Sequence, residues 1–279
     1  MRIFISADME GCTGVVCRAQ VLRDSAEYRG ALRLLHSDVN AAVEGAFRAG
    51  AAEVVVNDAH DSMMNLSPAE LDPRASLISG AGKPLSMVEG IEGAAAALFV
   101  GYHARAGAPG AVLEHTYSSR CLYRLEINGR EVGETAMNAG LAGHFGVPVA
   151  LLTGDAALMR EATADVPWAV TVAVKEGLGP GAADCLGMAA AAAAIREGTA
   201  RALAGVRSWT AKEREARLVV FAPPVTFALE LVTAGMAALA ERCPGARRTA
   251  ARRVEVTGED VVGAFAAFRT ALSLAVAAL

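Results

Sequence analysis

The chain's first chemically informative residues follow a short apolar run at its start. Residues 3–7 lead directly to Asp8, and Glu10 follows two positions later. Side chains two apart lie on one side of a strand, so both carboxylates can converge on one point just past its end. Two acids there repel each other unless a metal ion, an arginine or a shared proton lies between them. A solvated turn or a helix cap is the alternative interpretation.

The same pattern recurs twice, each time with a histidine at the end. Residues 53–57 lead to Asp58 and His60, and residues 97–102 lead to His103. Residues 24–50 have the spacing of an amphipathic helix, so a right-handed strand–helix–strand unit places Asp8 and His60 at the same sheet edge. Open α/β sheets form their sites at this edge. Asp58 is placed to orient the His60 ring.

A further carboxylate, Glu134, opens a predicted helix that follows a hairpin turn at Asn128-Gly129. An acid in the first helical turn also complements the helix dipole, so a purely structural role stays open. Carboxylates combined with imidazoles suit Zn²⁺ or Mn²⁺ better than Ca²⁺. Five ligands are more than one catalytic zinc ion takes, and they suit two ions about 3.5–4 Å apart. Such a pair of ions indicates metal-assisted hydrolysis. The five predicted ligands are Asp8, Glu10, His60, His103 and Glu134.

The other three histidines have different expected roles. His115 follows a loop rich in Ala, Gly and Pro, where it could act as general acid or base or stabilise a tetrahedral intermediate. A surface or loop-packing role is its alternative. His36 lies beside the apolar face of the first predicted helix and is expected in the core or an interface. His144, near a helix end, is expected to complement the helix dipole.

The order of the predicted elements indicates a three-layer α/β/α fold with a mainly parallel sheet. Residues 1–205 are expected to form the metal-binding catalytic domain, and residues 206–279 a smaller C-terminal α/β part involved in assembly. Within this layout we predict a helix over residues 182–203, a strand over 218–221, and a last helix capped by Thr257 with Asp260. The charged run 212–217 is expected to be a linker or a solvated surface.

Composition limits the partners and the compartment. The 279 residues carry a net charge of −4 without a basic stripe, which argues against nucleic acid. The five scattered cysteines do not form a secreted disulfide framework, and the first strand leaves no room for a signal peptide, so we expect a cytoplasmic protein. Residues 261–279 are nearly all apolar but rich in alanine and include Arg269. They indicate a buried or oligomer-facing helix rather than a membrane span.

Several short motifs lie in order along the first two thirds of the chain: SADMEG (6–11), NDAH (57–60), SMVEG (86–90), GYHA (101–104), HT (115–116), and GE (133–134) with NA (138–139). These motifs resemble those of the DppA-type D-aminopeptidases, a family of dizinc peptidases. The last third resembles the family only in general layout. Two alanines, Ala7 and Ala59, replace other small residues of the motifs, and Pro180 stands near an expected arginine.

The resemblance implies a role for each matching position. It implies that the five predicted ligands hold two Zn²⁺ ions per subunit, with Asp8 bridging them, and that His115 is the catalytic histidine. It further implies release of N-terminal D-amino acids from short peptides such as D-Ala-D-Ala. The implied assembly is a ring-shaped homo-oligomer, a decamer among the possible forms, with sites facing an internal channel. An amidase or phosphoesterase with the same metal pair, and a non-catalytic peptide-binding scaffold, are the alternatives.

Overall fold

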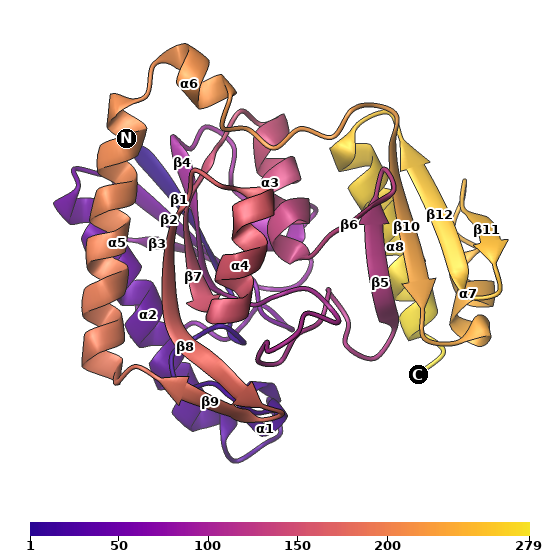
Figure 1. The fold of residues 1–279 in the computed structure, drawn as a ribbon, viewed down its shortest axis with the longest axis horizontal. Helices are drawn as coiled ribbons and strands as arrows, with labels where there is room; N and C mark the ends of the chain where they lie inside the picture. Colours follow the sequence, from indigo (N-terminus) through magenta and orange to yellow (C-terminus); the bar gives the residue numbers. More distant parts are fainter.

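The computed structural model describes residues 1–279, which form two sheets (Figure 1). The first sheet has seven strands, and its order is β3-β2-β1-β4-β7-β8-β9. Every neighbouring pair is parallel except β8 with β9. The strands are β1 (Arg2–Ala7), β2 (Glu53–Asp58), β3 (Ser76–Ile78), β4 (Ala96–Tyr102), β7 (Val149–Asp155), β8 (Val170–Gly179) and β9 (Ala182–Cys185).

Helices cover both faces of this sheet, as expected for central strands that are apolar on both sides. Ile3 and Ile5 of β1 pack towards α2 (Tyr28–Arg48) and α5 (Met188–Ser208). Phe4 points to the opposite face, which α3 (Glu134–His144) and α4 (Ala156–Asp165) cover (Figure 1). The predicted α/β/α layering with a mainly parallel sheet is therefore confirmed.

The second sheet is antiparallel, in the order β11-β12-β10-β5-β6. Its apolar core is continuous with one face of the first sheet, because Phe227, Phe265 and Phe268 belong to the same buried cluster as Phe4 and Phe99. Its elements are β5 (Leu122–Ile127), β6 (Arg130–Glu131), β10 (Val225–Leu231), α7 (Ala234–Ala240), β11 (Arg247–Ala250), β12 (Arg253–Gly258) and α8 (Val261–Val276).

The division into residues 1–205 and 206–279 stays a prediction. The structure adds that the second sheet takes β5 and β6 from residues 122–131, well before the predicted boundary. The chain therefore enters the second sheet, returns to the first for β7 to β9, and enters the second again. Most of the charged run expected as a linker or a solvated surface forms α6 (Ala211–Glu215), none of whose residues is buried. None of the helices combines the length and apolar character needed to cross a bilayer.

The predicted hairpin is confirmed, and three other local predictions are wrong. The Asn128-Gly129 hairpin joins β5 to β6, with positive φ at both turn residues. Residues 182–185 form β9, so the alanine-rich helix starts only at Met188. Residues 218–221 form no strand. The side chain of Asp260, rather than Thr257, caps α8 by accepting from the backbone N–H of Gly263.

Candidate metal centre

Three adjacent strands deliver the first predicted ligands. β1 lies between β2 and β4, and its last residue, Ala7, is in register with Asp58 of β2 and Val100 of β4. Asp8 directly follows β1, His103 directly follows β4, and His60 follows β2 by two residues. The shared carboxyl edge of parallel strands therefore places these side chains together, as the sequence predicts.

The turn after β1 packs so closely on the end of β4 that two positions at this contact, Gly11 and Gly101, have no room for a side chain. A Cβ atom at Gly11 would lie 1.8 Å from the carbonyl oxygen of Tyr102, and one at Gly101 would lie 2.2 Å from that of Asp8. Gly101 also has a positive φ, which favours glycine. The backbone N–H of Gly11 donates to the Gly101 carbonyl at 2.8 Å. This close approach fixes Asp8 and Glu10 relative to His103.

A buried lysine also holds this turn, and the sequence interpretation gave it no function. The Lys175 ammonium, from β8, donates to the carbonyl oxygens of Glu10, Cys12 and Val15, the Cys12 bond being 3.0 Å. Burial lowers the pKa of Lys175. Lys175 lies within β8, and no local sequence pattern marks it for this contact.

Asp8 lies between the two strand-end histidines. His60 Nδ1 is 3.4 Å from one carboxylate oxygen of Asp8, and His103 Nε2 is 3.5 Å from the other. Glu10 Oε2 is 2.9 Å from His60 Nδ1, whereas Glu134 Oε1 is 3.5 Å from His103 Nε2. Each histidine thus faces Asp8 and one further acid. A carboxylate with one oxygen in each half of a site has the arrangement of a bridging ligand.

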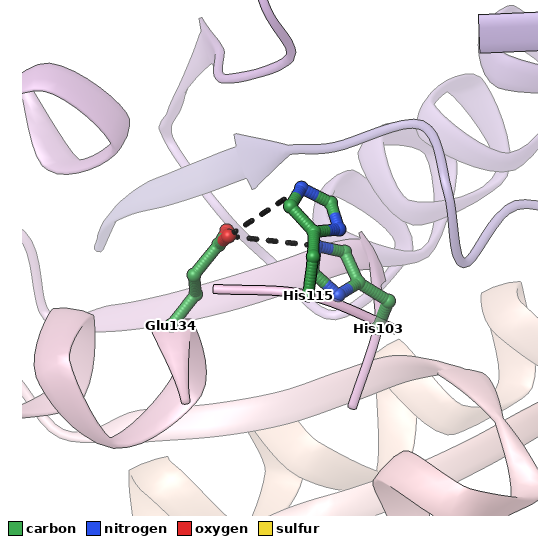
Figure 2. Close-up of side chains that lie close together, drawn as sticks. All are labelled: His103, His115 and Glu134. Atoms are coloured by element: carbon green, nitrogen blue, oxygen red, sulfur yellow. Dashed lines mark ion pairs between the residues drawn. The ribbon is translucent and has the colours of Figure 1, made fainter. Parts of the chain in front are cut away.

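His115 lies at the edge of this cluster. Its ring stacks on that of His103, with centroids 4.1 Å apart and planes 9° apart, and its Nε2 is 3.9 Å from Glu134 Oε1. Figure 2 shows both rings side by side, with Glu134 facing them. The side chain of His115 is 17% exposed, against 1% for His103. His115 is therefore the histidine of this pair that a molecule in the cleft can reach.

Backbone carbonyl groups fix the orientation of all three rings. His60 Nε2 lies 3.0 Å from the Val21 carbonyl, His103 Nδ1 3.0 Å from that of Ala104, and His115 Nδ1 3.0 Å from that of Leu113. A carbonyl oxygen only accepts, so the nitrogen facing it carries the hydrogen. The other nitrogen of a neutral ring then directs its lone pair at the carboxylates. Metal-bound histidines have this arrangement.

The electrostatics of the cluster call for a cation. The three acids are buried, and their ion pairs involve only histidines, with no arginine or lysine. Burial and the charge of Glu10 raise the pKa of Asp8 to about 7. Burial alone would lower the pKa values of His60 and His103, but the facing carboxylates raise both well above the ordinary range.

Two buried atoms of the cluster have no hydrogen-bond partner: His103 Nε2, and Glu10 Oε2, which faces Nδ1 of His60, a nitrogen without a hydrogen in the neutral ring. Buried polar atoms are rarely left in this state, because the loss of water is then uncompensated. A divalent cation would satisfy them together with the neighbouring carboxylates. Ligand atoms within 4.8 Å of one another form two such triads that share His103: Asp8, Glu10 and His103, and His103, His115 and Glu134. The donor set therefore fits zinc.

Asp58 has a different role from the one predicted. Its carboxylate accepts from the Asn65 side-chain amide at 2.8 Å and from the Leu66 backbone N–H at 2.7 Å. The Asn65 amide also donates to the His60 carbonyl at 2.7 Å. Asp58 thus holds the loop that carries His60, while the Val21 carbonyl orients the ring. His36 is a buried structural histidine, as expected, and its Nε2 accepts from the Ser67 backbone N–H.

The cluster opens into a cleft of about 460 Å³. Four of the five predicted ligands and His115 lie along it, whereas His103 is covered beneath them. Two basic side chains, Arg18 and Arg120, belong to the same lining, and neither has an ion pair or a hydrogen bond. The cleft thus presents acids at one group of positions and free guanidinium groups at another. No residue after Glu134 contributes to the lining.

Comparison with known proteins agrees with this geometry. The sequence profile of the D-aminopeptidase family matches residues 1–270. A D-aminopeptidase from Bacillus subtilis (strain 168) is 36% identical over 281 residues, which cover 99% of this chain and 98% of that protein. A solved structure, described as the Zn-dependent D-aminopeptidase DppA from Bacillus subtilis, a self-compartmentalizing protease, superposes with a TM-score of 0.92. The sequence of that structure is 32% identical, and the match covers 99% of this chain and 98% of that chain. The chain belongs to the D-aminopeptidase family.

Proposed function

We propose that the protein is a zinc-dependent aminopeptidase that releases N-terminal D-amino acids from short peptides such as D-Ala-D-Ala. The observation that carries the proposal is the buried cluster of acids and imidazoles, with two unpartnered atoms, at the base of a cleft. Its matched relative is described as Zn-dependent. Two zinc ions would be held by Asp8, Glu10, His60, His103 and Glu134, of which Asp8 faces both His60 and His103.

Zinc bound here would supply Lewis acidity, which acidifies water and polarises a peptide carbonyl group. The chain's own residues supply the rest. The carbonyl of Leu113 holds the Nδ1 hydrogen of His115, so Nε2 is the atom that takes or returns a proton at the reacting group. Burial and the neighbouring His103 lower the pKa of His115, which keeps the ring neutral near pH 7. We therefore propose His115 as the catalytic base.

The cleft has the size and charge expected for a short peptide. Its volume of about 460 Å³ lies within the usual range of about 300–1,000 Å³ for small-molecule sites. The N-terminal amine of a peptide is positive and its C-terminal carboxylate is negative at pH 7. The acidic cluster suits the amine, and the free guanidinium groups of Arg18 and Arg120 suit the carboxylate.

The relative's description as self-compartmentalizing supports a further proposal, that this chain assembles into a ring-shaped homo-oligomer such as a decamer. Light scattering after gel filtration measures the subunit number directly. A monomer at micromolar concentration would contradict the proposal. The cytoplasmic location expected from the sequence stays a prediction, and cell fractionation tests it.

The decisive experiment is a chirally resolved peptide panel on zinc-reconstituted protein. We expect hydrolysis of D-Ala-D-Ala, much slower hydrolysis of L-Ala-L-Ala, and none of a generic phosphoester. Hydrolysis of the phosphoester alone would replace the proposed reaction with phosphate-ester hydrolysis. Zinc stoichiometry is measured on the same sample, because a non-catalytic scaffold need hold none. Two zinc ions per chain with no turnover of any peptide would overturn the proposal.

A further inference from the structure

In the loop that carries His115, two residues with an unfavourable backbone conformation each supply a backbone group to the site. Leu113 and Tyr117 have φ values of 57° and 61°, in the left-handed region that residues with side chains rarely adopt. The Leu113 carbonyl faces His115 Nδ1, and the Tyr117 backbone N–H donates to Glu134 Oε1 at 2.7 Å. Surrounding contacts must stabilise this conformation, because the residues themselves disfavour it.

The Tyr117 side chain supplies such contacts. Its hydroxyl donates to Ser86 Oγ at 2.7 Å, and Arg269 Nη1 donates to it at 3.1 Å. The rings of Phe265 and Phe268 meet the tyrosine ring edge-on, with centroids 6.3 and 5.3 Å away. Tyr117 is thus held from one side by residues of the first part of the chain and from the other by α8.

Arg269 is the polar end of this contact from α8. Its guanidinium carbon lies 5.4 Å from the Tyr117 ring centroid, within cation–π range. It has no carboxylate partner, and its side-chain hydrogen bond goes to the Tyr117 hydroxyl. A half-buried arginine normally pairs with an acid, since removal of its charge from water is otherwise poorly compensated. Arg269 has no such acid, so its hydrogen bond to the Tyr117 hydroxyl calls for a functional explanation.

We propose that Arg269 is a positioning residue: through Tyr117 it sets the backbone N–H that orients Glu134 and the loop that carries His115. This inference rests on the proposed function, because it assigns Glu134 to metal binding. It connects the C-terminal part to a cleft that none of its residues lines. The second sheet and α8 support the site by fixing one side chain, Tyr117.

The test is a double-mutant cycle with zinc affinity and kinetics as readouts. Arg269→Met keeps much of the side-chain length and removes the donors, whereas Tyr117→Phe keeps the ring and removes the hydroxyl. Each single change should weaken zinc binding about tenfold, since partners that orient ligands contribute about 10–100-fold to metal affinity. We expect kcat to fall with little change in KM. Both changes remove the Arg269–Tyr117 hydrogen bond, and Tyr117→Phe also removes the bond to Ser86. The loss in the double variant should therefore be smaller than the sum of the two single losses. Arg269→Lys should restore most of the affinity.

Arg252→Met is the matched control. Arg252 also lies over a tyrosine ring, that of Tyr123 at 5.7 Å, and donates to the Val232 carbonyl; unlike Arg269, it also pairs with a carboxylate, that of Glu230, at 3.0 Å. It has no contact with the cleft, so its variant should bind zinc as the wild type does. Zinc affinity is measured by competition with a chromogenic chelator, and circular dichroism checks that each variant is folded.

Three outcomes would overturn the proposal: wild-type zinc affinity in folded Arg269→Met, losses equal to those of Arg252→Met, or additive losses in the double variant. If Arg269→Met does not fold, Tyr117→Phe alone decides, and unchanged affinity in it overturns the proposal. Failure of the proposed function is a separate result. A wild-type protein that binds zinc and cleaves no peptide rejects the peptidase, whereas the zinc affinities still test the role of Arg269.

Discussion

The two sheets of this protein differ in the number of residues near them that have an unfavourable backbone conformation. Six residues other than glycine have positive φ. Asp61, Met63, Leu113 and Tyr117 line the cleft at the first sheet, and Ser86 hydrogen-bonds to Tyr117. The second sheet has one such residue, Asn128, in a hairpin turn that favours it. Backbone strain of about 1–3 kcal/mol per residue therefore collects around the cleft, while the second sheet stays regular.

The electrostatics of the two sheets differ in the same way. The acids at the first sheet are buried and face histidines, so the loss of any partner leaves a buried charge. The second sheet carries partly exposed arginine–glutamate pairs such as Arg253 with Glu126 at 2.7 Å. Such pairs usually contribute about 0–1 kcal/mol. The comparison teaches that one sheet is organised for chemistry and the other for stability and support.

Removal of a predicted ligand should have the largest effect. Asp8→Ala or His60→Ala should abolish zinc binding and lower kcat by more than about 100-fold, since even indirect partners of a metal are worth up to that factor. Metal analysis and D-Ala-D-Ala hydrolysis measure both. His144→Ala, which changes an exposed histidine, is the control. Full zinc content in the Asp8 variant would remove it from the ligand set.

Removal of the proposed base should separate metal binding from turnover. His115→Ala should keep zinc and lose about 10²–10⁴-fold in kcat, the usual contribution of a positioned acid or base. Zinc content and single-turnover rates check the two statements independently. Retained turnover would show that another group moves the proton.

A core change in the second sheet should affect stability without affecting zinc. Leu229→Ala, at a fully buried position of β10, should lower the free energy of unfolding by about 2–5 kcal/mol. Zinc affinity at 20 °C should be unchanged, because Leu229 does not line the cleft. Urea unfolding and chelator competition measure the two quantities. Val220→Ala, at a position that is 72% exposed, is the control. Weakened zinc binding in folded Leu229→Ala would break the comparison between the sheets.

The pH dependence should show the smallest effect. Burial and His103 lower the pKa of His115, and the neutral ring is the form that accepts a proton. The value of kcat/KM should therefore rise with pH through a pKa below the ordinary value of about 6.5 for histidine and level off by neutral pH. This limb should be absent in the residual activity of His115→Ala. A limb centred above 6.5 would contradict the assignment.

The sequence predicts the central features of the site because they follow from local pattern and topology. A strand–helix–strand unit determines that β1 and β2 are parallel, so Asp8 and His60 had to meet. Glu134 was identified as the first residue of a helix, where the structure has it. The Asn128-Gly129 turn depends on neighbouring residues only, and it is confirmed.

Long-range contacts were not predictable in this way. Lys175 reaches the turn after β1 from 165 residues away, and Arg269 reaches Tyr117 from 152 residues away. Neither leaves a local pattern. The role of Asp58 was mistaken because spacing does not show whether a carboxylate turns towards a ring or towards the loop beyond it. The strand expected over residues 218–221 failed because Phe221 instead packs against Gly140 of α3.

The central place of β1 makes metal uptake a report on correct folding. Side chains alternate along a strand, so a slip of one residue against β2 or β4 would turn Asp8 away from both histidines and present Met9 instead. A chain with that error could not bring its acids and imidazoles to one point. Newly made molecules that bind zinc tightly would then be those in which β1 is paired in the correct register with β2 and β4. Zinc binding would thus distinguish correctly folded sheets from misfolded ones.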